Sequence, residues 1–437
     1  MKMEDENSMN ALMDKASKLL NDWKKGSYVF GLGVLDQLGE LTRKYGQRAL
    51  VVSADAYLKP VTDAAIASLE QAGVTVLLNG TIPGAKPNAP REDVYRLESY
   101  ILHHKPDCVV AVGGGSTIDA CKAAAMLAAY GGVFTPEIDS YFGTGIVTEV
   151  HNRTGIGMIP VIAVETSASS GAHLTKYANI TDPVAGQKKL IVDPAIVPKA
   201  CLFDYKTTCS MPVSVSVDGA LDAIAHTFEV FCGAKPETYE LASKLAETGI
   251  DLTLSYAKRV MQEPGDLEAR HALGLATDLG GYAIMIGGTS GAHQTSFSLV
   301  DLVAHGTACG IMNPYYAIFY SPAIQPQLEV VGRILKKHGF IGDDVSRLTG
   351  RSRAEAVAAG LIAFGKSINA PTKLRDLKGF SETHVQRILK AAKDPQLSMK
   401  LKNMPIPMTA DDVDPYMEPI IRAAVNGDFS LIINKPE

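Results

Sequence analysis

Residues 109–122 read VVAVGGGSTIDACK, an apolar run that leads through three glycines into a helical pattern. The apolar run predicts a buried strand, and the glycines at 113–115 let the backbone approach a ligand closely. Ser116 is placed to cap the following helix, with Asp119 in the capping-box position. Because free amides at a helix N-terminus favour a phosphate group, the segment predicts a pyrophosphate cradle. A tight turn without a ligand is the alternative, since the segment does not match the GxGxxG fingerprint of an ordinary Rossmann fold.

Strand and helix patterns alternate around this segment through the first half of the chain. Short β-branched runs, and the helical patterns between them, occupy residues 49–53, 57–73, 74–78, 91–105, 107–112 and 158–164. Alternation of this kind predicts a mostly parallel sheet flanked by helices.

The second half of the chain has a different character. From about Val213 onward strand-like runs nearly vanish, and helical patterns follow one another, separated by the segments EPGD, GGTSG and MNPYY. A chain of 437 residues also exceeds the usual size of a single hydrophobic core. We therefore expect an α/β domain over residues 1–205, which carries the predicted cradle, and an all-helical domain over residues 206–437.

The composition excludes several classes of protein. With 46% hydrophobic and 20% charged residues, a net charge of -5 and no run of lysines or arginines, the chain reads as a globular enzyme without a nucleic-acid partner. The first twenty residues start acidic and do not read as a signal peptide, and no apolar stretch approaches the roughly 18 residues of a membrane span. The 6 cysteines are scattered without a CxxC pair, which favours reduced thiols and a cytoplasmic location.

Four polar residues in the second half have the composition of a metal site. Asp222 and His226 lie in the helical pattern SVDGALDAIAHTFEVF, where their i,i+4 spacing puts both side chains on one face. His293 and His305 lie in SGAHQTSFSLVDLVAHGTACG, where neighbouring small residues allow each to stand at a turn or a helix end. One carboxylate and three imidazoles suit Fe(II) or Zn(II) better than Mg or Ca. A solvated helix face gives the same i,i+4 pair, so spacing alone leaves both readings open.

A second polar loop of small residues, Glu165 to His173, follows the strand pattern MIPVIAV. Its hydroxyls and exposed amides could serve a phosphate, a ribose or a nicotinamide amide. A plain surface loop has a similar composition, and within it a solvated histidine is the expected state of His173.

With GGGSTIDACK, DAIAHTFE and the two distal histidines in the same order, the chain resembles the iron-containing (group III) alcohol dehydrogenases, relatives of glycerol dehydrogenase and dehydroquinate synthase. The resemblance extends from YVFGLGVLDQLGEL to at least MNPYY. It implies an N-terminal α/β dinucleotide-binding domain, a C-terminal all-helical domain and a metal in the cleft between them.

The resemblance also implies roles for particular residues. The residues that match the family's metal ligands are Asp222, His226, His293 and His305. The residues that match its pyrophosphate loop and the helix after it are Gly113, Gly114, Gly115, Ser116, Asp119 and Lys122. Thr166 and Ser167 fall where the family has a Thr-Thr pair near the nicotinamide.

The chain departs from the family pattern at several positions. Phe297 stands where many members have a second histidine near the nicotinamide, so a proton relay through that position is not expected. Residues 170–173 read SGAH in place of the family's TGSE, which makes His173 as a proton relay the alternative to a solvated loop histidine. The distal histidine segment is two residues shorter than in common members. After the strand at 49–53, Asp55 is placed to bond the adenine ribose, which favours NAD over NADP, although a shift of one residue would put Ala54 there.

These expectations combine into one function, a metal-dependent oxidoreductase that interconverts an alcohol and its aldehyde or ketone by hydride transfer to or from NAD(P). The metal is Fe(2+), with Zn(2+) as the alternative. The rival functions are a zinc polyol dehydrogenase of the glycerol type, a more remote lyase like dehydroquinate synthase, and a non-catalytic assembly protein that keeps the fold. A small-molecule alcohol or aldehyde is the expected partner. Because members of the family form dimers and larger assemblies, the resemblance implies a homo-oligomer, dimer or larger.

Overall fold

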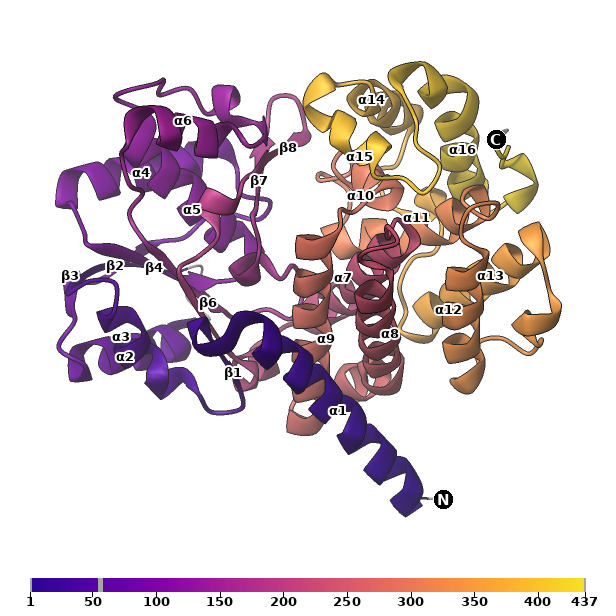
Figure 1. Ribbon diagram of the computed structural model, residues 1–437, viewed down its shortest axis with the longest axis horizontal. Helices are drawn as coiled ribbons and strands as arrows, with labels where there is room; N and C mark the ends of the chain where they lie inside the picture. Colours follow the sequence, from indigo (N-terminus) through magenta and orange to yellow (C-terminus); the bar gives the residue numbers. More distant parts are fainter. Residues whose placement is uncertain (1, 54–57, 436–437) are drawn as a thin grey trace. The chain divides into compact units, whose positions relative to one another are not determined.

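The glycine-flanked strand β4 (Cys108–Gly113) lies inside a six-stranded sheet with the order β1-β9-β6-β4-β2-β3, in which every neighbouring pair is parallel (Figure 1). The other strands are β1 (Tyr28–Gly31), β2 (Arg48–Ser53), β3 (Thr75–Pro83), β6 (Val161–Glu165) and β9 (Ala200–Asp204). The predicted parallel sheet is confirmed, although β6 begins three residues later than the predicted 158–164 run and neither β1 nor β9 was predicted. Every residue of β4 and β6 is buried, as expected for strands with helices on both faces.

The computed structural model describes residues 2–53 and 58–435, which fold as two compact units. One unit is Leu20–Met211, and the other combines Met1–Leu19 with Pro212–Glu437. The first contains the sheet, and the second contains helices and no strand among the residues described. The fold class predicted from the sequence is therefore confirmed.

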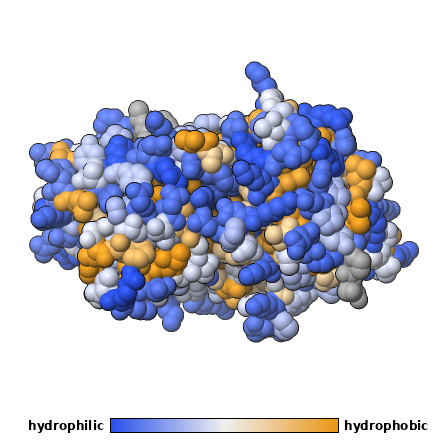
Figure 2. Space-filling model, turned by 90° about the horizontal axis from the view of Figure 1, so that it is seen from above, coloured by the Kyte–Doolittle hydropathy of each residue, from blue (hydrophilic) through white to orange (hydrophobic). Residues whose placement is uncertain are grey.

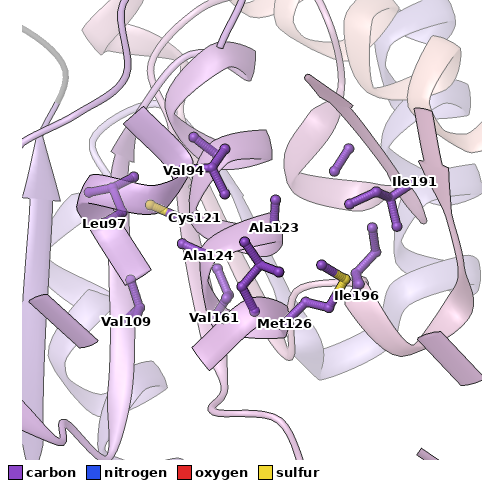
Figure 3. Packing of buried hydrophobic residues seen from close by; sticks show 14 of the residues in the cluster. Val94, Leu97, Val109, Cys121, Ala123, Ala124, Met126, Val161, Ile191 and Ile196 are labelled. Atoms are coloured by element: carbon purple, nitrogen blue, oxygen red, sulfur yellow. The ribbon is translucent and has the colours of Figure 1, made fainter. Parts of the chain in front are cut away.

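Side chains alternate along the strands between two hydrophobic clusters, one on each face of the sheet. Val109 of β4 and Val161 of β6 pack with α4 (Arg91–His104) and α5 (Gly115–Tyr130), as Figure 3 shows. The alternate residues of the same strands pack with α2 (Leu38–Arg43) and α3 (Lys59–Gln71). The period of two along a strand thus explains how a continuous apolar run serves both layers.

A smaller sheet of β5 (Gly143–Thr144), β8 (Gln187–Val192) and β7 (Tyr177–Asp182) was not predicted. Strands β7 and β8 form an antiparallel hairpin. Asp119 of α5 anchors this hairpin, because one of its carboxylate oxygens accepts hydrogen bonds from the backbone N and the Nδ2 of Asn179, both at 3.0 Å. Asp119 is therefore not half of a capping box, and that prediction was wrong.

The second unit is a succession of helices, among which α7, α8 and α9 pack side by side (Figure 1). The helices are α1 (Lys2–Lys24, which continues into the first unit), α7 (Val213–Cys232), α8 (Tyr239–Gln262), α9 (Leu267–Ile286), α10 (Gly291–Ser296), α11 (His305–Phe319), α12 (Gln325–Lys337), α13 (Gly350–Ser367), α14 (Glu382–Ala392), α15 (Ser398–Lys402) and α16 (Glu418–Asn426). None of the described helices is long and apolar enough to cross a membrane. Hydrophilic residues predominate on the face in Figure 2, with hydrophobic residues in scattered groups.

Two of the three predicted helix breaks are present. The segments EPGD and GGTSG separate α8 from α9 and α9 from α10. The predicted break at MNPYY was wrong, because α11 continues through Pro314. A proline inside a helix costs about 3 kcal/mol. Burial of α11 against α7 and α13 outweighs that cost here.

Helix α11 begins in close contact with α7. Gly306 has no room for a side chain, since a Cβ there would meet the carbonyl oxygen of Asp218 and come within 2.6 Å of the Cβ of Asp222. Asp218 also caps the start of α11, because its Oδ1 accepts hydrogen bonds from the backbone N of Thr307 at 2.7 Å and from its hydroxyl at 3.0 Å. Together the missing side chain and the cap fix the first turn of α11 beside α7.

We expect Gly306→Ala to destabilise the protein by about 1–3 kcal/mol, because the added methyl group must push the start of α11 away from α7. Urea denaturation of the variant and the wild-type protein measures the loss. Gly342→Ala is the matched control, since a Cβ at Gly342 meets nothing within 4 Å. Equal unfolding midpoints for the two variants would contradict the close contact.

Candidate metal centre and coenzyme loops

Three helices bring the four predicted metal ligands together. Asp222 and His226 lie one turn apart on α7, His293 lies on the short helix α10, and His305 is the first residue of α11. Their four candidate ligand atoms all lie within 4.8 Å of one another. Only the side chain of His305 has appreciable exposure, at 22%.

The distances between these atoms are close to those that a shared ion requires. The Oδ1 atom of Asp222 is 3.7 Å from the Nε2 of His226, 3.7 Å from the Nε2 of His293 and 4.0 Å from the Nε2 of His305. Donors that share a tetrahedral ion at about 2.1 Å lie roughly 3.4 Å apart. One carboxylate and three imidazoles in this spacing therefore fit a divalent ion of the Fe(2+) or Zn(2+) kind.

Hydrogen bonds at the far side of two rings point the Nε2 atoms inward. The Nδ1 of His293 donates to the Oε1 of Glu229 at 2.6 Å, and the Nδ1 of His305 lies 3.0 Å from the hydroxyl of Ser296. That hydroxyl donates its own hydrogen to the carbonyl of His293, so it accepts from His305. Both rings are thereby held as the tautomer whose Nε2 carries the lone pair that a metal needs.

Sequence reasoning missed Glu229, although a signal for it was present. It is the third residue after His226 on α7, and its carboxylate also accepts a hydrogen bond from the backbone N of Ser290 at 2.8 Å. Burial alone would raise the pKa of Glu229, but the nearby His293 and the Ser290 N–H bring the pKa below its usual range. The group is therefore a charged acceptor, which strengthens the hydrogen bond from His293.

Burial lowers the pKa of His226 well below its ordinary value, and the neighbouring His293 and Lys400 act in the same direction. A metal binds only the neutral form of an imidazole. The environment of His226 thus favours the form that a metal ligand requires.

The glycine loop has the predicted position at the end of β4, but its helix begins earlier than expected. Helix α5 starts at Gly115, with Gly114 as the N-cap residue and no side-chain cap. Ser116 therefore lies inside the first turn, where its hydroxyl accepts a hydrogen bond from the backbone N of Asn88 at 3.0 Å. The prediction that Ser116 caps the helix was wrong.

The two predicted coenzyme loops touch each other at the carboxyl ends of β4 and β6. A Cβ on Gly114 would lie 2.6 Å from the hydroxyl oxygen of Ser167. The Oε1 of Glu165 accepts hydrogen bonds from the backbone N of Thr166 at 3.1 Å and from the backbone N and hydroxyl of Ser167 at 2.9 and 2.8 Å. The Thr166–Ser167 turn is therefore held in one conformation beside the glycines. Asp55, predicted to face the ribose, lies outside the described residues.

His173 is buried, which corrects the expectation of a solvated loop histidine. Its side chain has 0% exposure, with Nδ1 3.2 Å from the Oε2 of Glu165 and Nε2 3.2 Å from the hydroxyl of Tyr28. Gly171, in the left-handed region at φ 62°, turns the chain inward just before it. Composition could not reveal this, because the partner Tyr28 is distant in sequence.

Lys122 is also buried and has a structural partner. Its ammonium group donates to the carbonyl of Tyr177 at 2.6 Å and lies 3.2 Å from Asp119. These contacts join α5 to the β7–β8 hairpin.

Comparison with known proteins agrees with this architecture. Residues 26–205 match the family model of the iron-containing alcohol dehydrogenases, and residues 216–421 match the C-terminal model of the Fe-containing alcohol dehydrogenase family. The NAD-dependent methanol dehydrogenase of Bacillus methanolicus is 25% identical over 370 residues, 83% of this chain and 91% of that protein. The choline dehydrogenase of Bacillus subtilis is 29% identical over 374 residues, 84% of this chain and 87% of that protein.

A solved structure has the same fold. The NADH-dependent butanol dehydrogenase A of Thermotoga maritima superposes with a TM-score of 0.75 at 24% identity, over 91% of this chain and 96% of that one. The two family models together cover most of the sequence, on both units of the structure. The protein belongs to the iron-containing alcohol dehydrogenase family and is an NAD(P)-dependent oxidoreductase of alcohols.

Proposed function

We propose that this protein interconverts a small primary alcohol and its aldehyde, with NAD as coenzyme and Fe(2+) held by Asp222, His226, His293 and His305. The convergence of these four donor atoms within 4.8 Å carries the proposal. When bound there, the ion polarises the substrate oxygen as a Lewis acid. The names of several relatives support the substrate class, since they specify methanol, butanol and 1,3-propanediol.

The residues of the centre have distinct tasks in this proposal. Asp222 supplies the single carboxylate among the donors, so one of the two positive charges of the ion stays uncompensated. His305 marks the accessible side of the centre because it is the donor with the largest exposure. Glu229 and Ser296 orient the rings of His293 and His305 before any ion binds.

For the coenzyme, we propose that the start of α5 holds the pyrophosphate and that the Thr166–Ser167 turn lies at the nicotinamide. The glycine loop supports this assignment because Gly114 and Gly115 put backbone without side chains at the N-terminus of α5. The position of these two loops supports coenzyme binding by residues 1–205, and the position of the four donors supports metal binding by residues 206–437. Relatives include both NAD-dependent and NADPH-dependent enzymes, and we propose NAD for this chain on account of Asp55.

We also propose a cytoplasmic location and a homo-oligomer, dimer or larger. All 6 cysteines are free thiols, which suits a reducing compartment. The family's dimers and larger assemblies support the second proposal. Light scattering on the purified protein tests it, and a monomer at micromolar concentration would refute it.

Asp222→Ala and His305→Ala should each deplete bound metal and abolish alcohol-dependent reduction of NAD, because each removes a donor from the centre. Coenzyme binding, followed by NADH fluorescence, should survive, since the glycine loop lies on the other compact unit. His103→Ala, at an exposed position, is the control. Full turnover by either donor variant after treatment with a chelator would refute the metal mechanism.

Glu229→Gln should weaken metal affinity by about 10- to 100-fold, because the amide is a weaker acceptor for the Nδ1 proton of His293. A chelator competition assay measures the change. The exposed Glu240→Gln serves as the control on the same unit. The same affinity in both variants would show that the hydrogen bond to His293 does not matter for metal binding.

Gly114→Val should lower coenzyme affinity at least fivefold, because its side chain would displace Ser167 and cover the amides at the start of α5. NADH fluorescence gives the affinity, and metal content should stay at the wild-type level. Gly157→Val is the control, since a Cβ there meets nothing within 4 Å. Wild-type NADH affinity in Gly114→Val would count against the cradle.

A further inference from the structure

Lys400 lies close to the metal centre although it comes from a distant part of the chain. It belongs to the short helix α15 and is 2% exposed. Its ammonium group hydrogen-bonds the hydroxyl of Thr289 and lies 5.4 Å from the centre of the Phe297 ring. That ring stacks on the imidazole of His305, with 5.9 Å between ring centres and 11° between the planes.

The ammonium group of Lys400 lies in the surroundings of the Glu229 carboxylate, close enough for their charges to interact. Burial lowers the pKa of Lys400 to about 8, and the negative charge of Glu229 opposes that shift. Thr289, the hydrogen-bond partner of Lys400, precedes Ser290, whose backbone N and hydroxyl donate to the Oε2 of Glu229 at 2.8 and 3.3 Å. A lysine buried this fully is costly, and nearby opposite charge is the usual reason that it is tolerated.

Glu229 is the natural counter-charge. Glu229 is 2% exposed, and its carboxylate accepts the hydrogen bond from the Nδ1 of His293. Without a nearby cation, this second carboxylate would add a full negative charge to a centre that already contains Asp222. A divalent ion would then bind more tightly, and more of its charge would be neutralised by the protein.

We propose that Lys400 is a positioning residue of the metal centre, whose ammonium group balances Glu229 and leaves more of the ion's positive charge for the substrate oxygen. The inference rests on the proposed function. This role and a purely structural role for Lys400 predict opposite changes in metal affinity when Lys400 is replaced. Loss of a structural contact loosens a site, whereas loss of a nearby positive charge strengthens its hold on a cation.

The test measures Zn(2+) affinity of the whole enzyme by chelator competition, together with turnover per bound metal. Lys400→Met should bind Zn(2+) about tenfold more tightly or better, with turnover at least tenfold lower. Lys400→Gln, which keeps a polar group for Thr289, should shift both quantities in the same directions. Lys400→Arg retains the charge and should restore both to within about threefold of wild type. The exposed Lys402→Met should change neither quantity.

Equal or weaker Zn(2+) binding in both neutral variants would overturn the inference, as would a Lys400→Arg variant that behaves like them. If Lys400→Met does not fold, Lys400→Gln alone decides. Failure of the wild-type enzyme to bind Zn(2+) or Fe(2+) at all would instead refute the proposed function. The two failures are therefore distinguishable.

Discussion

The helical unit depends on one costly requirement, the burial of the Asp222 carboxylate among three imidazoles. Asp222 has 0% exposure, and removing a carboxylate from water is strongly unfavourable unless other charges or hydrogen bonds compensate. A divalent ion bound by the same four donors would supply that compensation. The packing of α7, α10 and α11 makes the arrangement possible, since it brings donors from three separate segments to one point. A small residue also lets α9 approach α7 at the centre, since a Cβ on Gly280 would come within 3.1 Å of His226.

Local patterns in the sequence were sufficient for the parts of the fold that depend on periodicity. The run that became β4 and the i,i+4 pair on α7 could both be predicted, because a strand and a helix impose their own spacing on the sequence. The order of the motifs then identified the family. Where the sequence failed, long-range packing was decisive. Pro314 lies inside a helix, and Gly114 rather than Ser116 is the N-cap of α5. Both outcomes depend on contacts with residues outside the local sequence.

The same limit applies to the surroundings of the site. Glu229 could have been found, because it shares a helix with two predicted donors. His173 and Lys400 could not, since each depends on a partner far away in sequence, Tyr28 for the first and Thr289 for the second. Both are ionisable groups, a kind of residue that is most often exposed. Their burial results from tertiary structure alone.

His305 differs from the other donors in being both the most accessible and the first residue of its helix. The end of a helix frays more readily than its middle, but opening the first turn of α11 also breaks the hydrogen bonds from Thr307 to Asp218 on α7. Brief opening of that turn would release one of four bonds and leave three in place. In an enzyme that binds its ion as proposed, local unfolding of this one capped turn would limit how fast the ion exchanges with solution.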